Sequence, residues 1–125
     1  MKIIKNVPIY DRLYLSPIIS ALRGDMGMVH SGVKVLSALR LSEGETKLSE
    51  LQQTGDKLLW NRLTAPVVNL KFEDRDYEFL MSVFDQRDKE KVWEINEDVD
   101  FLIKRFRKAE DFVEPPVETA KKAEI

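Results

Sequence analysis

The run VVNLKFEDRDYEFLMSVF, residues 67–84, decides the fold class because its hydrophobic period changes halfway along. In residues 67–73 apolar and polar side chains alternate, which predicts a strand with one apolar face. After a cap at Glu73 or Asp74, apolar residues recur every three or four positions, which predicts an amphipathic helix that ends near residues 86–90. Its buried face should carry Tyr77, Leu80, Met81 and Phe84, with Phe79 and Val83 beside it. A strand leading into such a helix predicts an α+β domain.

Two other runs predict further strands. Residues 57–63 contain three leucines and a tryptophan, and the short linker Thr64-Ala65-Pro66 predicts a hairpin that pairs them with residues 67–73. Residues 2–6 predict a short strand that joins the sheet at its edge. Pro8 ends that strand because it offers no N–H group to a partner.

Residues 11–22 predict a helix that Pro17 interrupts. Two interpretations remain open. One is a kinked helix from Asp11, and the other is a turn followed by a helix with Ser16 as N-cap and Pro17 at its first position. In both, Gly24 is the expected C-terminal cap.

The next helix has the clearest apolar stripe in the chain. This stripe consists of Val29, Val33, Leu36 and Leu39, and its members recur at helical spacing. We therefore expect the stripe to face the core, with Val35 and Ala38 widening the apolar face. Ser42 and Glu45 then form the pattern of a capping box, which predicts a short helix to about residue 53 that buries Leu48 and Leu51.

Near the C-terminus, Asn96 is the expected cap of a last helix with an acidic first turn and a basic last turn. Its buried face should consist of Val99, Leu102, Ile103 and Phe106. We therefore expect one α+β domain in residues 1–109, with about five helices packed on a small antiparallel hairpin or sheet. Residues 110–125 are polar and predict a flexible tail.

Composition narrows the function classes. The 125 residues carry a net charge of -2 and no cysteine, which excludes disulfides and thiolate chemistry. No window resembles a signal peptide or a membrane span, so we expect a cytoplasmic protein without a membrane partner. The near-neutral charge also leaves no long-range field that would attract nucleic acid.

Candidate catalytic groups lack the partners that catalysis requires. His30, the only histidine, has no nucleophile or orienting carboxylate at a predictable distance. The acidic clusters at residues 74–78 and 97–100 lie where helix N-termini favour negative charge. We expect no catalytic, cofactor-binding or metal-binding residue, no cofactor and no enzymatic activity. A hydrolase or transferase built on acids alone would instead need a pocket with at least two carboxylates of raised pKa.

Six residues are candidates for binding a partner. Trp60 and Trp93 are of the type that anchors interfaces, and a basic cluster comprises Lys104, Arg105, Arg107 and Lys108. Helices near 11–22, 29–40 and 43–53 followed by a hairpin at 57–73 have the order of a winged helix, whose third helix reads DNA. That helix carries Glu43, Glu45 and Glu50 against Lys47 alone, so phosphates would repel it. A protein partner is therefore our leading hypothesis, and a winged-helix-like nucleic-acid-binding regulator is the alternative; a homo-oligomer stays open.

A spaced pattern over residues 10–106 resembles a group of small uncharacterised proteins encoded by tailed bacteriophages. The pattern consists of Asp11-Arg12-Leu13-x-Leu15, Val33-Lys34-Val35-Leu36-x-x-Leu39-Arg40, Trp60-Asn61, the strand and aromatic-rich helix at 68–84, and Phe101-x-x-Lys104-x-Phe106. The resemblance implies a viral protein that acts in the cytoplasm of a bacterial host, as an inhibitor, adaptor or assembly factor for a host or phage protein. It implies no catalytic residue.

Overall fold

The computed structural model of the protein describes residues 1–111, in which β1 (Lys2–Val7) is the centre of a three-stranded antiparallel sheet. β4 (Val68–Phe72) pairs with one side of β1, with Ile4 opposite Leu70, and β5 (Glu110–Asp111) pairs with the other. The expectation that the first strand lies at the sheet edge is therefore wrong. It is flanked on both sides because residues 110 and 111, which we assigned to the tail, pair with it. The rest of that predicted tail, 112–125, lies outside the described residues.

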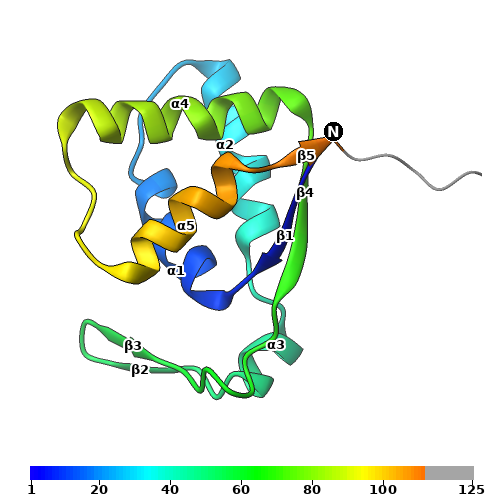
Figure 1. Ribbon diagram of the computed structural model, residues 1–125, viewed down its shortest axis with the longest axis vertical. Helices are drawn as coiled ribbons and strands as arrows, with labels where there is room; N and C mark the ends of the chain where they lie inside the picture. Colours follow the sequence, from blue (N-terminus) through cyan, green and yellow to red (C-terminus); the bar gives the residue numbers. More distant parts are fainter. Residues whose placement is uncertain (112–125) are drawn as a thin grey trace, which may run out of the picture.

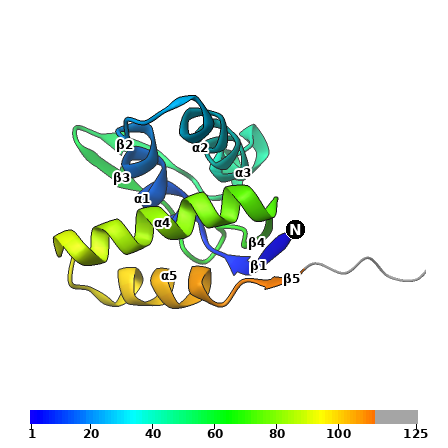
Figure 2. The ribbon, with the colours of Figure 1, turned by 90° about the horizontal axis from the view of Figure 1, so that it is seen from above.

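Five helices accompany the sheet within residues 1–111. They are α1 (Ile9–Ser20), α2 (Met26–Leu39), α3 (Glu43–Leu48), α4 (Asp74–Glu90) and α5 (Glu97–Arg107). Seen from above, α4 crosses the molecule with α5 on one side and α1 and α2 on the other (Figure 2). The sheet lies along one side of these helices (Figure 1). This arrangement confirms the predicted α+β class.

The core lies where the sheet meets the helices. Its buried side chains come from the inner face of β1 and β4 and from four helices: Ile4, Val7, Leu15, Ile19, Val35, Leu39, Leu70, Phe72, Leu80, Phe84, Leu102 and Phe106. Burial of these large apolar groups is the main term that stabilises the fold.

The two C-terminal helices form where the sequence predicts them. In α4, Leu80 and Phe84 are buried as expected, and the left-handed Lys91 ends the helix. In α5, the Asn96 side chain accepts a hydrogen bond from the Val99 amide at 2.9 Å, which confirms the predicted cap. The Tyr77 hydroxyl donates to the Phe106 carbonyl at 2.7 Å and so joins the two helices.

Of the two interpretations of the first helix, the continuous one is correct. α1 runs from Ile9 through Pro17 to Ser20, and Ser16 is not an N-cap. The Ser16 hydroxyl instead donates to the Arg12 carbonyl at 2.7 Å, inside the helix. The C-cap is Ala21 rather than Gly24, because the helix ends at Ser20, two residues before the predicted end at residue 22.

The predicted hairpin between residues 57–63 and 67–73 is wrong. β3 (Lys57–Leu59) pairs with β2 (Gln52–Thr54), because Gly55 at φ 63° turns the chain back immediately after β2. β4 pairs with β1 instead, which lets their inner faces share one core. The helix predicted to reach residue 53 therefore ends at Leu48, which is exposed rather than buried. The β2–β3 hairpin lies at the opposite end of the molecule from α4 (Figure 1).

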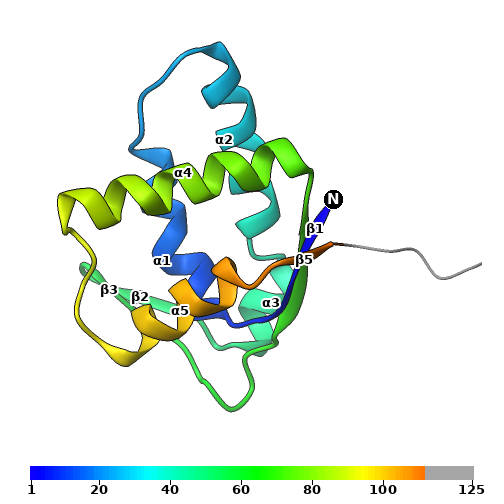
Figure 3. The same ribbon diagram turned by 45° about the horizontal axis from the view of Figure 1, so that its top comes forward.

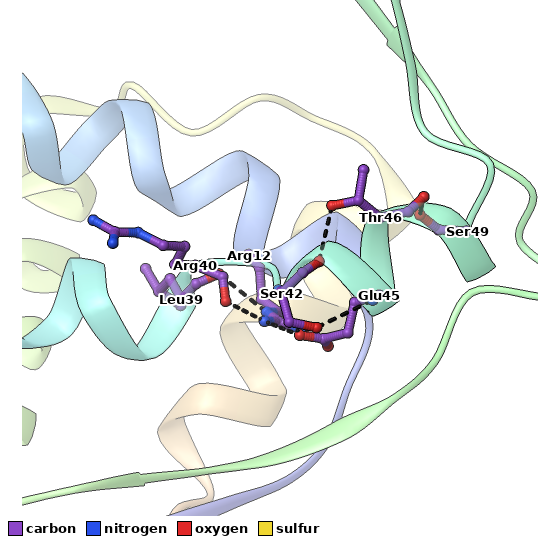
Figure 4. Close-up of polar contacts among 7 residues, drawn as sticks. All are labelled: Arg12, Leu39, Arg40, Ser42, Glu45, Thr46 and Ser49. Atoms are coloured by element: carbon purple, nitrogen blue, oxygen red, sulfur yellow. Dashed lines mark hydrogen bonds and ion pairs between the residues drawn. The ribbon is translucent and has the colours of Figure 1, made fainter.

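Arg12 joins three helices through buried hydrogen bonds (Figure 4). Its Nε donates to the Leu39 carbonyl at 3.0 Å, and Nη2 donates to the Arg40 carbonyl at 2.6 Å. The same guanidinium binds both carboxylate oxygens of Glu45. Glu45 also closes the predicted capping box with Ser42, whose hydroxyl accepts from the Glu45 amide at 3.1 Å. Hydrogen bonding to Arg12 lowers the pKa of Glu45 to about 2.

Candidate protein-binding surface

The most exposed apolar side chains of a long helix are on α2, where the sequence predicts a buried stripe. Val29 and Val33 are 56% and 57% exposed, whereas Val35 and Leu39 are fully buried. The predicted stripe of Val29, Val33, Leu36 and Leu39 was expected to face the core, and this expectation is wrong for Val29 and Val33. The packed face of α2 instead includes Ser31 and Gly32.

Small residues occupy part of the face that α2 packs against the rest of the protein. A Cβ atom placed on Gly32 would meet the Phe79 ring at 3.7 Å and the Ile19 side chain at 4.0 Å. Gly32 therefore lies where α2 meets both α1 and α4, and a Cβ atom there would make ordinary van der Waals contacts. Because the small residues occupy the contact, Val29 and Val33 are turned outward.

Neighbouring apolar groups extend this face into a patch. Residues 21–30, which connect α1 to α2 and form the first turns of α2, are all exposed. Figure 3 shows this connection and the start of α2 standing beyond α4. Met26 is 89% exposed, and Leu22 and Met28 are partly exposed. We refer to Leu22, Met26, Met28, Val29 and Val33 together as the α2 surface.

Three adjacent hollows make the α2 surface a groove. The central one, about 150 Å³, lies between the end of α1 and α2 and is bounded by Leu22, Met28, Val29 and Val33. It shares Leu22 and Met28 with a hollow of about 750 Å³ that reaches α4. It shares Val29 and Val33 with one of about 810 Å³ that extends to Arg75. The shared lining residues show that the three hollows are adjacent on this surface.

Arginine side chains line this groove at both sides. Arg23 borders the central hollow, and Arg75 and His30 border the hollow at the start of α2. Within residues 1–111 neither arginine forms an ion pair. The acids that line the hollows are already engaged: Asp25 accepts from the Met28 amide at 2.9 Å, and Glu90 accepts from Gln86 at 2.6 Å.

The two tryptophans lie elsewhere. The Trp93 indole stacks on Tyr14, meets the edge of Phe84 at 5.1 Å between ring centroids and donates to Asp88 at 2.6 Å. Trp93 therefore packs against the core. Trp60 lies 6.2 Å from the Tyr10 ring, with the Arg62 guanidinium 5.3 Å from its own ring centre. It lines a separate hollow of about 190 Å³.

That hollow contains the two carboxylates that an acid-based enzyme would need. Asp11, at the start of α1, is almost fully buried and forms an ion pair with Arg105 of α5. Burial raises the pKa of Asp11 to about 6, and Arg105 opposes that rise. Asp98 pairs with Arg62 at 3.1 Å. Because each carboxylate is bound by an arginine, the arrangement links α1, α5 and the segment before β4 rather than presenting a free acid and base.

The predicted basic cluster is largely compensated by acids. Lys104 pairs with Asp100 at 2.9 Å, and Arg105 pairs with Asp11. Arg107 pairs with Asp85 at 2.9 Å and with Asp88 at 3.0 Å. Lys108 is exposed at the end of α5. Sequence reasoning identified this cluster but missed the groove, whose arginines stand far apart in the chain.

Three surveys of the chain complete the description. Among residues 1–111, no group of three His, Cys, Asp or Glu side chains is arranged to hold a metal ion. In the same part of the chain, no helix combines the length and apolar character that a bilayer crossing requires. Comparison with protein-family models, curated proteins and solved structures returned no match.

Proposed function

We propose that this protein is a non-enzymatic interaction module that binds another protein through the α2 surface. The observation that carries the proposal is the exposure of Val29 and Val33 on a helix whose opposite face is fully buried. Contiguous exposed apolar patches on small proteins mark contact surfaces more often than isolated apolar residues do. Two of the five members are methionines, whose flexible thioethers adapt to a partner's shape.

Apolar burial alone would give weak binding. Covering these five side chains, which expose roughly 400 Å² of apolar surface, contributes on the order of 10 kcal/mol at about 25 cal/mol per Å². Loss of translational and rotational freedom offsets much of that gain. The charged rim of the groove must therefore contribute to affinity and specificity.

The resemblance to small phage proteins suggests where such a module would act. A phage-encoded protein of this kind would bind a host or phage protein in the host cytoplasm, as an inhibitor, adaptor or assembly factor. The alternative, a nucleic-acid-binding regulator, would need free cations. Three of the four basic residues at the end of α5 are ion-paired with carboxylates, so we favour a protein partner.

Site-specific photo-cross-linking in the cells that produce the protein tests the proposal. A benzophenone amino acid at Val33 should give a discrete adduct of higher mass. Adding Val29→Asp to the same molecule should abolish that adduct. The matched control places the photoreactive residue at Leu63, which is 97% exposed but lies outside the α2 surface. The same adducts from both positions, or none from Val33, would contradict the proposal.

A further inference from the structure

The groove on α2 has the form of a helix-binding site. Met26, Val29 and Val33 are separated by three and four residues, so they form a row along one side of the helix. α1 and α4 already pack against the other sides of α2. The free side therefore offers ridges and hollows with the spacing into which the side chains of another helix fit.

The charges around that row select the partner's chemistry. Arg23 lies toward the end of α1, and Arg75 lies at the start of α4, with Val29 and Val33 between them. Both guanidinium groups are exposed, and within the described chain neither has a carboxylate partner. Carboxylates on a bound segment would pair with these groups.

On this basis we infer that the occupant of the groove is an acidic amphipathic helix of another protein, with apolar residues against Met26, Val29 and Val33 and carboxylates against Arg23 and Arg75. The inference rests on the proposed function and names the partner's chemistry. A second copy of this chain fits less well. A two-fold interface would place the same patch, with its arginines, against itself, and like charges would then face each other.

Titration of the full chain with three matched synthetic helical peptides tests this inference. The peptides share one apolar face and differ only in flanking residues, which are Glu, Gln or Lys. Methyl and amide NMR signals report the contact site. The Glu peptide should bind saturably and shift the signals of Met26, Val29 and Val33. The Lys peptide should bind at least tenfold more weakly, because it faces the arginines.

Charge reversal provides the stricter test. Arg23→Glu with Arg75→Glu should invert the preference between the Glu and Lys peptides. The control, Lys104→Glu with Lys108→Glu, changes the net charge equally but lies on α5, and it should leave the preference unchanged. Circular dichroism verifies that each variant is folded.

The outcomes separate this inference from the proposed function. Equal binding of all three peptides in the groove would overturn the acidic partner but retain the docking surface. Shifts outside the groove, or no binding of any peptide, would overturn the helical occupant. Concentration-dependent dimerisation in sedimentation would assign the groove to a second copy. Binding to vesicles of anionic phospholipid without peptide preference would assign it to a membrane surface. If no peptide binds and the photoreactive residue at Val33 also gives no cross-link, the proposed function itself would be overturned.

Discussion

At the scale of single residues, the buried side chains of Arg12 and Asp11 each link helices through an ion pair. Arg12 is almost fully buried, and its guanidinium satisfies two carbonyls and one carboxylate. A buried charge of this kind contributes little net stability when paired, but removing one partner leaves the others desolvated and unbound. Replacement of Arg12 therefore affects α1, α2 and α3 at once.

We expect Arg12→Met to lower the free energy of unfolding by about 3 kcal/mol, because Glu45 and two carbonyls lose their donor. Urea unfolding followed by circular dichroism measures the change. The matched control is Lys104→Ala, which breaks an exposed ion pair with Asp100 and should leave the midpoint nearly unchanged. Equal effects of the two substitutions would show that the Arg12 network is not a structural link.

Because the pKa of Asp11 is raised, its contribution to the free energy of unfolding should fall as the pH increases. An acid whose pKa is lowered by an ion pair would contribute more as the pH increases. Burial raises the pKa of its carboxyl from 3.8 to about 6 in the folded protein. Its contribution to stability is therefore complete below about pH 4 and is lost as the pH rises through 6. This difference in pKa corresponds to about 3 kcal/mol. Unfolding of the wild type and of Asp11→Asn from pH 4 to 7 measures it, since the variant should lack this decline. An Asp11 carboxyl signal that titrates below pH 4 would contradict the prediction.

At the scale of elements, α2 has one packed and one open face, and the two should differ in mutational cost. Val35→Ala removes methyl groups from the core and should lower the unfolding free energy by about 2 kcal/mol. Val33→Ala, two residues away on the same helix, should change it by less than about 0.5 kcal/mol. Thermal or urea unfolding of both variants provides the comparison. A larger cost at Val33 than at Val35 would mean that the stripe predicted from sequence faces the core after all.

The elements that could be predicted are those whose local signals agree with their packing. In α4 and α5 the capping residues and the apolar period correctly predict the observed helices. Each helix has a single apolar stripe, and that stripe packs against the core. The α2 stripe misled because period alone identifies an apolar face but not the face that packs. The packed face instead includes the small residues Ser31 and Gly32, which an apolar-period analysis does not count.

Strand pairing was predicted poorly for a related reason. The sequence around residues 57–73 suggests a local hairpin, but β4 pairs instead with β1, whose Ile4 lies 66 positions before its partner Leu70. Such long-range pairing has no local signature. The groove was likewise invisible in the sequence, because Arg23 and Arg75 reach neighbouring hollows on α2 only in the folded protein.

At the scale of the whole molecule, the described residues divide into a stable body and an outward-facing edge. The sheet and helices share one core, and residues 21–30 extend beyond it (Figure 3). All ten of these residues are exposed. A folded protein that keeps Met26, Val29 and Val33 exposed has a surface suited to contact with a partner. The central claim is therefore that the α2 surface is open to solvent in the free protein.

Methyl NMR of the dilute protein with a soluble paramagnetic agent tests that claim most directly. The agent broadens signals of methyl groups that solvent can reach. We predict strong broadening of the Val29 and Val33 methyl signals and little broadening of the Val35 signals. Protection of Val29 and Val33 equal to that of Val35 would contradict the account, because the proposed contact surface would then be covered.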